Sequence, residues 1–182
     1  GRGFIIDSQK FDDDNSRQRI TDNNKTGEQL RIAFRILVEK LRDLKSENAE
    51  LFDYIYESII SSDIPDGEDY DFIRSAFQEE FSEFLKSNVR TIHGEYVHID
   101  TAQYTSEKLE WIPIEEIGTN RHWVSTDIRK KYDRCGVKGI TRVGLSDLIL
   151  SADAQKLSKW ILSLDKALYE KFHNIVVPFI SK

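Results

Sequence analysis

One pair of residues has the form of a zinc deaminase motif. His93 and Glu95 stand in a His-x-Glu pattern, in which the histidine would bind the metal and the glutamate would transfer protons. That chemistry also requires a Pro-Cys-x-x-Cys sequence to complete the zinc site, and Cys135 is the only cysteine in the chain. We therefore interpret His93-Gly94-Glu95 as a hairpin turn.

Two other short patterns are equally incomplete. Ser163 and Lys166 match the Ser-x-x-Lys nucleophile motif of penicillin-binding enzymes, but the companion Ser-Asp-Asn sequence is absent. Gly136 and Gly139 have the Gly-x-x-Gly form of the KH-domain loop, which joins two helices. Here the residues that follow favour a strand, so neither pattern predicts a site.

The histidines do not form a metal site in sequence. None of the four shows the i, i+4 spacing of a helical zinc site or lies in a Cys-x-x-Cys frame; they are His93, His98, His122 and His173. The sequence therefore predicts no catalytic residue, no metal site and no cofactor. An active site assembled from scattered residues leaves no local pattern, so an enzyme stays the third alternative.

The strongest candidate for a binding site is a basic segment, residues 121–142. Basic side chains interleaved with aromatic ones can neutralise phosphates or acidic side chains. The candidate contact residues are Arg121, Trp123, Arg129, Lys130, Lys131, Arg134, Lys138 and Arg142. Two interpretations stay open: a partner site for an anionic molecule, including nucleic acid, or a basic surface that is solvated or docked on acidic helices of the same fold.

Charge is distributed unevenly along the chain. Residues 1–118 contain 14 Lys and Arg against 26 Asp and Glu, a net charge of −12; residues 119–182 contain 12 against 6, a net charge of +6, and together they give −6. Such asymmetry is compatible with both interpretations of the basic segment.

Composition indicates a folded domain in a reducing compartment. The 182 residues are 39% hydrophobic and 32% charged, which suits one helix-rich core. A lone cysteine cannot form an internal disulfide, and the chain lacks the roughly 18-residue apolar run that a membrane span needs. We expect a cytoplasmic protein that does not bind membranes. The absence of Met predicts a piece of a longer protein.

The first half of the chain predicts a helical bundle. Residues 1–25 lack apolar periodicity and are expected to form a mobile arm. Thr26 and Gln29 have the form of a capping box, and apolar residues then recur every three or four positions. Further helices are predicted from Ser46, ending in residues 61–67, and over residues 68–89. Residues 26–90 would form the bundle.

The second half predicts a small mixed α/β unit, residues 91–182, sharing one core with the bundle. Short strands are expected at residues 96–99, 109–114, 121–124 and 140–143. A helix over residues 128–135, closed by Gly136, suggests a winged-helix-like arrangement with residues 127–135 as the groove helix. Ser151 would cap a long carboxy-terminal helix.

The predicted fold class is mainly α, α+β: an amino-terminal helical bundle, a small mixed α/β unit that is winged-helix-like in order, and a long carboxy-terminal helix. We expect a noncatalytic protein-interaction or regulatory module of a larger intracellular protein. Its partners would be other domains of that protein, a separate protein or a second copy. The alternative is a nucleic-acid-binding module that uses residues 121–142.

Overall fold

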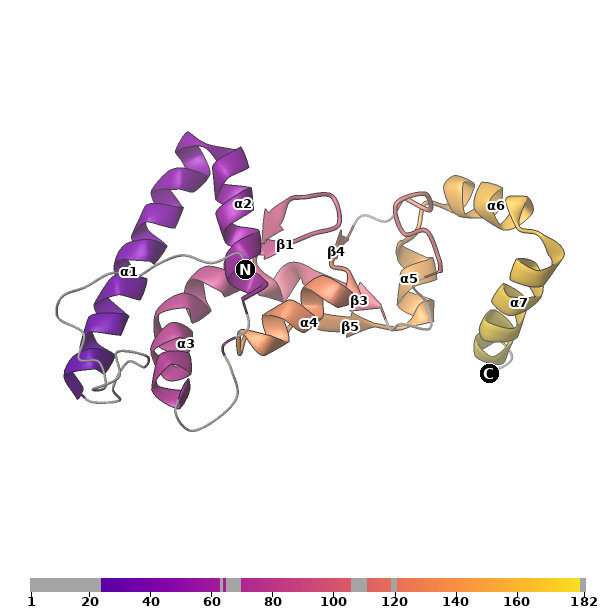
Figure 1. Cartoon of the computed structure of the whole chain (residues 1–182). Coiled ribbons are helices and arrows are strands. Elements are labelled where there is room, and N and C mark those ends of the chain that lie inside the picture. Colours follow the sequence, from indigo (N-terminus) through magenta and orange to yellow (C-terminus); the bar gives the residue numbers. More distant parts are fainter. Residues whose placement is uncertain (1–23, 63, 65–69, 106–110, 119–120, 181–182) are drawn as a thin grey trace. The chain divides into compact units, whose positions relative to one another are not determined.

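The computed structural model describes residues 24–62, 64, 70–105, 111–118 and 121–180 (Figure 1). These residues divide into two compact units. The first takes in the described residues up to Ser87 together with Lys130–Lys138; the second takes in Asn88–Arg129 and those from Gly139 onward. The predicted arm, residues 1–25, lies outside the described residues except for residues 24–25, which begin the first helix.

Three helices make up most of the first unit: α1 (Asn24–Glu47), α2 (Ala49–Ile60) and α3 (Asp71–Lys86). Helix α1 packs against both α2 and α3. Its buried face consists of Leu30, Phe34, Val38 and Leu41, which recur every three or four residues as predicted. Leu37, which belongs to the same predicted stripe, is only half-buried.

Aromatic rings fill the core between these helices. Phe34 of α1 contacts Phe77 and Phe81 of α3 edge to face, with ring centroids 5.7 and 5.8 Å apart. Phe52 of α2 meets Phe84 of α3 at 6.4 Å in the same geometry. Such pairs contribute about 0.5–1.5 kcal/mol each beyond the area they bury. The aromatic residues of α3 therefore join it to both neighbours.

The helix ends differ in part from the prediction. Helix α1 begins at Asn24, so Thr26 lies inside the helix and is buried instead of capping it. Helix α2 begins after Asn48, whose side chain accepts a hydrogen bond from the amide of Leu51 at 3.0 Å. Asparagine satisfies a free first-turn amide as well as serine does, which explains why this helix starts later than Ser46.

A short hairpin opens the second unit. Strands β1 (Val89–Arg90) and β2 (Tyr96–Val97) pair antiparallel. The amide of Thr91 donates to the carbonyl of Glu95 at 2.8 Å, and Gly94 turns the chain with φ of 79°. A positive φ of this size favours glycine. The interpretation of His93-Gly94-Glu95 as a hairpin turn is confirmed.

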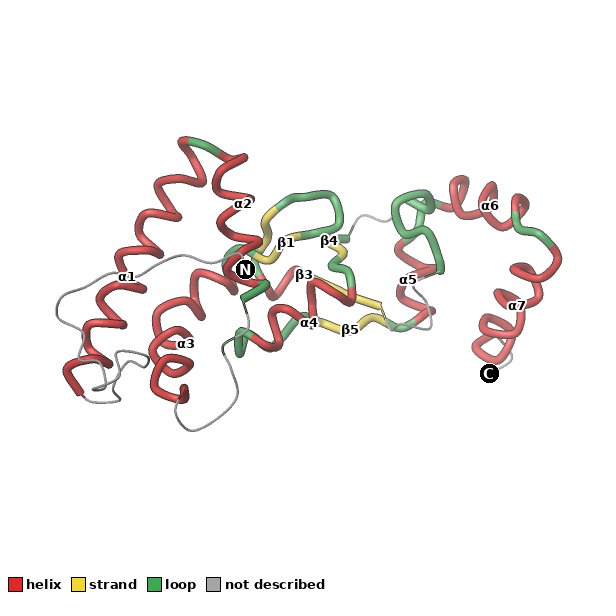
Figure 2. The backbone as a smooth tube through the Cα atoms, in the orientation of Figure 1, coloured by secondary structure: helices red, strands yellow, loops and turns green. Residues whose placement is uncertain are grey.

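The other strands form a parallel sheet, yellow in Figure 2. Strand β3 (Ala102–Thr105) lies between β4 (His122–Trp123) and β5 (Thr141–Val143) and is parallel to both. The β4 and β5 predictions are confirmed. Strand β3 was not predicted, and the strand expected at residues 109–114 is wrong over residues 111–114, which form turns; residues 109–110 lie outside the described part.

Three helices follow the sheet: α5 (Leu145–Ser151), α6 (Ala154–Ser163) and α7 (Lys166–Ile180). The expected single carboxy-terminal helix is thus divided. Asp153, not Ser151, caps α6, and Asp165 accepts the amide of Leu168 at 2.8 Å at the start of α7. Each aspartate accepts hydrogen bonds from amides in the first turn of the helix that follows it. In a continuous helix these amides would bond to backbone carbonyls of the preceding turn, so the cap at Asp165 favours a break between α6 and α7.

The core of the second unit lies between the parallel sheet and these helices. Trp123 of β4 and Leu148 of α5 are fully buried in it. Trp160 of α6 contacts Phe172 of α7 edge to face, with centroids 5.4 Å apart. The unit is therefore held together by large apolar side chains from strands and helices that are far apart in sequence.

The observed architecture confirms a mainly α, α+β fold. The winged-helix arrangement is not confirmed, because the strands on either side of α4 (Thr126–Arg134) are parallel partners of β3. In the part of the chain that the structure describes, no helix combines the length and apolar character required to cross a membrane.

Candidate functional site

Helix α4 carries most of the predicted basic site, and local interactions define both its ends. The hydroxyl of Ser125 accepts a hydrogen bond from the amide of Ile128 at 3.2 Å. At the other end, Val137 donates to the carbonyl of Tyr132 at 2.9 Å and Gly136 donates to Asp133 at 3.0 Å, with Gly136 at φ of 78°. This is the hydrogen-bond pattern of a Schellman cap. The prediction that Gly136 closes the helix is confirmed.

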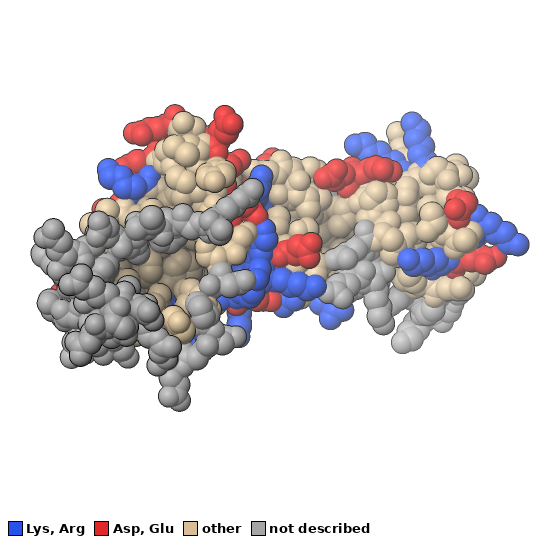
Figure 3. Space-filling model, in the orientation of Figure 1, with Lys and Arg blue, Asp and Glu red and all other residues tan. Residues whose placement is uncertain are grey.

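The eight predicted contact residues are divided between the two compact units. The first unit holds Lys130, Lys131, Arg134 and Lys138; the second holds Arg121, Trp123, Arg129 and Arg142. Figure 3 shows Lys and Arg side chains gathered at α4, with acidic side chains among them.

In the first unit, part of α4 is docked on α2. The hydroxyls of Tyr132 and Tyr56 are 2.6 Å apart, and both residues are fully buried. Lys131 forms an ion pair with Glu57, and both side chains are largely buried. The position of Lys131 therefore agrees with the interpretation in which the basic segment docks on an acidic helix of the same fold.

The other basic residues of this set are exposed. Lys130 and Arg134 lie four residues apart on α4, which places them on one face of the helix, and Lys138 follows the cap. All three residues are exposed. They form the part of the predicted site in the first unit that is accessible to an anionic partner.

In the second unit, most of the predicted residues contribute to the fold. The guanidinium of Arg121 donates to the side-chain oxygen of Gln103 at 2.8 Å, and that of Arg129 lies 5.0 Å from the ring centroid of Tyr104. Trp123 is fully buried, so in this structure its ring is part of the core and is not available to stack on a base. Of this set, Arg142 is exposed, whereas Arg121 and Arg129 are partly buried.

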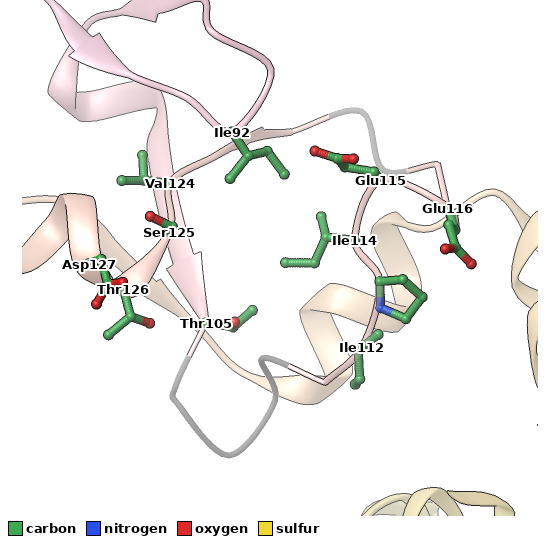
Figure 4. Close-up of a pocket in the computed structure, with 11 residues that line it drawn as sticks. Ile92, Thr105, Ile112, Ile114, Glu115, Glu116, Val124, Ser125, Thr126 and Asp127 are labelled. Carbon is green, nitrogen blue, oxygen red and sulfur yellow. The ribbon is translucent and has the colours of Figure 1, made fainter.

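A cavity of about 430 Å³ lies in the second unit (Figure 4). It opens at the carboxyl ends of β3 and β4, where Thr105 is the last residue of β3 and Val124 follows β4, and next to the first turn of α4. Sequence reasoning missed this cavity. Its lining includes Ser125 and Thr126 at the start of α4, and Thr105 belongs to the strand that was not predicted.

Apolar side chains are exposed on the helices of the second unit. Leu162 near the end of α6 is 86% exposed, and Leu168 and Tyr169 in the first turn of α7 are 39% and 48% exposed. Leu150 of α5 is 83% exposed. We call Leu162, Leu168 and Tyr169 the α6–α7 apolar surface, because they flank the break between the two helices.

The residues that suggested catalytic chemistry have structural roles. The hydroxyl of Ser163 donates to the carbonyl of Trp160 at 2.7 Å, and Lys166 begins the next helix. His98 accepts the amide of Asp100 at 3.3 Å and starts a short 3-10 helix, Ile99–Thr101. Over the described ranges, no group of three His, Cys, Asp or Glu side chains is placed to hold a metal ion.

An ion pair between α1 and α3 alters the titration of both partners. The guanidinium of Arg35 donates to the two carboxylate oxygens of Glu80 at 2.7 and 3.1 Å. These hydrogen bonds favour the ionised carboxylate, so they lower the pKa of Glu80 and raise the pKa of Arg35. This pair stabilises the first unit and lies on helices other than α4.

The fold and its surfaces define a mainly helical α+β protein with a small parallel sheet. Comparison of the chain with family models, curated proteins and solved structures finds no match.

Proposed function

We propose that the chain is a noncatalytic protein-interaction module of a larger intracellular protein. The observation that carries the proposal is the α6–α7 apolar surface. Leu162 is 86% exposed, whereas Trp160 and Phe172 on the same pair of helices are buried. Leu162 therefore lies on the face of α6 away from the buried Trp160, and Leu168 and Tyr169 extend the side of α7 that carries Phe172.

Burial of this surface by a partner would be favourable. Removing a leucine side chain fully from water is worth about 1.5–3 kcal/mol, and an amphipathic tyrosine adds contact area at little conformational cost. Contiguous exposed apolar residues on soluble proteins mark interaction sites. A partner that covers Leu162, Leu168 and Tyr169 together would gain from all three.

The buried cysteine supports an intracellular location. Cys135 is the only cysteine of the chain, it is buried in the first unit, and its sulfur lies 3.9 Å from the carbonyl of Ile60. A fold of this size that uses no disulfide suits the reducing cytoplasm. Its buried thiol packs as a small apolar group.

Site-specific photo-crosslinking tests the proposal. A photoreactive residue replaces Leu162 in one variant and Leu150 in a matched control, because the two leucines are equally exposed but lie on different helices. In the source cells we expect one discrete adduct from position 162 that position 150 does not form and that Tyr169→Gln abolishes. Mass spectrometry then identifies a separate protein, another domain or a second copy. Equal adduct patterns from positions 162 and 150 would contradict the proposal.

Nucleic-acid binding is the second candidate, and the exposed charges of Lys130, Arg134 and Lys138 favour it. These residues belong to one compact unit; Lys130 and Arg134 share a face of α4 at i, i+4 spacing, and Lys138 follows the helix cap. Basic residues in such a row can neutralise successive phosphates. The burial of Trp123 leaves this candidate without the aromatic contact that the sequence suggested.

Fluorescence anisotropy with labelled duplex and single-stranded DNA, at two salt concentrations, tests this second candidate. Replacing the three residues by Gln should reduce the slope of log K against log salt by up to about three units, one for each lost phosphate contact. The control carries Gln at three exposed lysines of the second unit, Lys156, Lys159 and Lys166, and removes the same total charge. Equal slopes for the two variants would refute a specific role for the α4 face.

A further inference from the structure

The cavity of the second unit lies where ligands bind in sheets of parallel strands. Thr105 ends β3, and Val124 and Ser125 follow β4, so the cavity is at the carboxyl ends of two parallel neighbours. In open α/β sheets, ligands bind in the crevice outside the carboxyl ends of the strands. Its volume of about 430 Å³ is also within the range of small-molecule sites. Position and size therefore suit a small ligand.

Part of the cavity wall is apolar. Ile92, Ile112, Ile114 and Val124 line it, and Figure 4 shows Ile92 and Ile114 facing the same space from different segments. Ile112 and Val124 are nearly fully buried and belong to the packed interior. A ligand would place an apolar body against these side chains.

Two largely buried residues contribute hydroxyl groups to the lining of the same cavity. Thr105 and Thr126 are only 5% and 8% exposed. Among the residues with described positions, neither side chain forms a hydrogen bond, whereas the hydroxyl of Ser125 is used to cap α4. Both threonine hydroxyl oxygens keep some access to solvent from the cavity. These two groups are therefore available to a polar atom of a ligand.

The charge of the lining is negative. Glu115, Glu116 and Asp127 line the cavity and are exposed to solvent, and the lining residues that the structure describes include no Lys, Arg or His. The first turn of α4 would by itself favour an anion, but Asp127 and the Ser125 hydroxyl already complement that helix end. Charge complementarity thus selects a cation.

We propose that this cavity binds a small organic ammonium compound with a compact apolar body. The apolar body packs between Ile92 and Ile114, and the ammonium group donates to the threonine hydroxyls and faces the carboxylates of Glu115 and Asp127. An ammonium group carries three donors and no acceptor, which matches a lining of hydroxyl and carboxylate oxygens. This ligand site is separate from the protein-interaction surface proposed above.

The test uses benzylamine as the probe, with benzyl alcohol and benzoate as neutral and anionic analogues of the same shape. Binding to the full chain is followed by two-dimensional amide NMR. Benzylamine should shift the amides of residues 112–116 and 124–127 saturably, and benzyl alcohol should bind about fivefold more weakly, as expected for a screened charge contact near a protein surface. Benzoate should bind least.

Two variants separate a ligand site from a structural feature. Thr105→Val replaces the hydroxyl by a methyl group of the same shape, so it should weaken benzylamine binding while leaving the melting midpoint unchanged or higher. Glu115→Gln should reduce affinity about fivefold, and Glu170→Gln, an exposed acid on α7, serves as the control that should not.

Three results would overturn the proposal. They are benzoate binding at least as tightly as benzylamine, shifts spread over the chain without saturation, and equal affinity in the wild type and Thr105→Val. A lysine-containing peptide that binds the same amides more tightly than benzylamine would assign the cavity to a protein partner instead of a small molecule.

Discussion

The hydroxyl pair of Tyr56 and Tyr132 allows a quantitative test of whether α4 is docked in the first unit. Both residues are fully buried, with 0% of their surface exposed, and their hydroxyl oxygens are 2.6 Å apart. Replacing either one by Phe removes a single oxygen and leaves the other hydroxyl buried without this partner. The perturbation changes no charge and little volume.

The expected magnitude follows from the asymmetry between making and breaking a buried hydrogen bond. Each single variant should lose about 1–3 kcal/mol of unfolding free energy, because a buried hydroxyl keeps its desolvation cost after it loses its partner. The double variant replaces both hydroxyls by apolar edges, so it should lose less than the sum of the two single effects. We expect a coupling energy of about 1 kcal/mol.

Native-state hydrogen exchange of amides in α2 and α3 is the appropriate assay, because those helices belong to the same unit as Tyr132. All three tryptophans, Trp111, Trp123 and Trp160, lie in the second unit, so tryptophan fluorescence reports on that unit separately. Additive effects of the two substitutions in the exchange of α2 and α3 would refute the reasoning. So would single effects below about 0.5 kcal/mol.

Further substitutions test other parts of the fold by urea unfolding. Gly136→Ala should cost about 1–2 kcal/mol from its left-handed φ and more from contact with the Gln78 side chain, whereas Gly94→Ala, with open space around it, should show the backbone cost alone. Trp160→Ala should cost about 3–5 kcal/mol as a buried core residue. Glu80→Gln should change how the free energy of unfolding depends on pH. Because the pKa of Glu80 is lowered, the wild type should be more stable than the variant above pH 4.5, the ordinary pKa of a glutamate. This difference should disappear as the pH falls through the pKa of Glu80 in the folded protein. A variant whose deficit is unchanged at low pH would contradict the Arg35–Glu80 assignment.

Helical periodicity accounts for what could be predicted of the first unit. Leu30, Phe34, Val38 and Leu41 were identified as one stripe and are buried together. The pattern is strong because α1 repeats it over 24 residues, so each position supports the others. Gly136 was also identified correctly, since few residues other than glycine adopt the conformation that closes α4.

The second unit was harder to predict because its strands are short. Strand β3 spans four residues and β4 spans two, too few for alternation to distinguish a strand from a turn. The break in the carboxy-terminal helices at Asp165 was missed, because apolar spacing continues on both sides of it. Boundaries set by a single capping side chain are weakly marked in sequence.

Sequence by itself determined the helical character, the charge asymmetry and the presence of a basic segment. Only the tertiary structure decided which basic residues face solvent: Lys131 pairs with Glu57 and Arg129 lies over Tyr104, whereas Lys130 remains exposed. It alone placed Trp123 in the core and brought the cavity's lining together. The physical reason is that each of these contacts joins residues distant in the chain, and side-chain type and local spacing do not specify such partners.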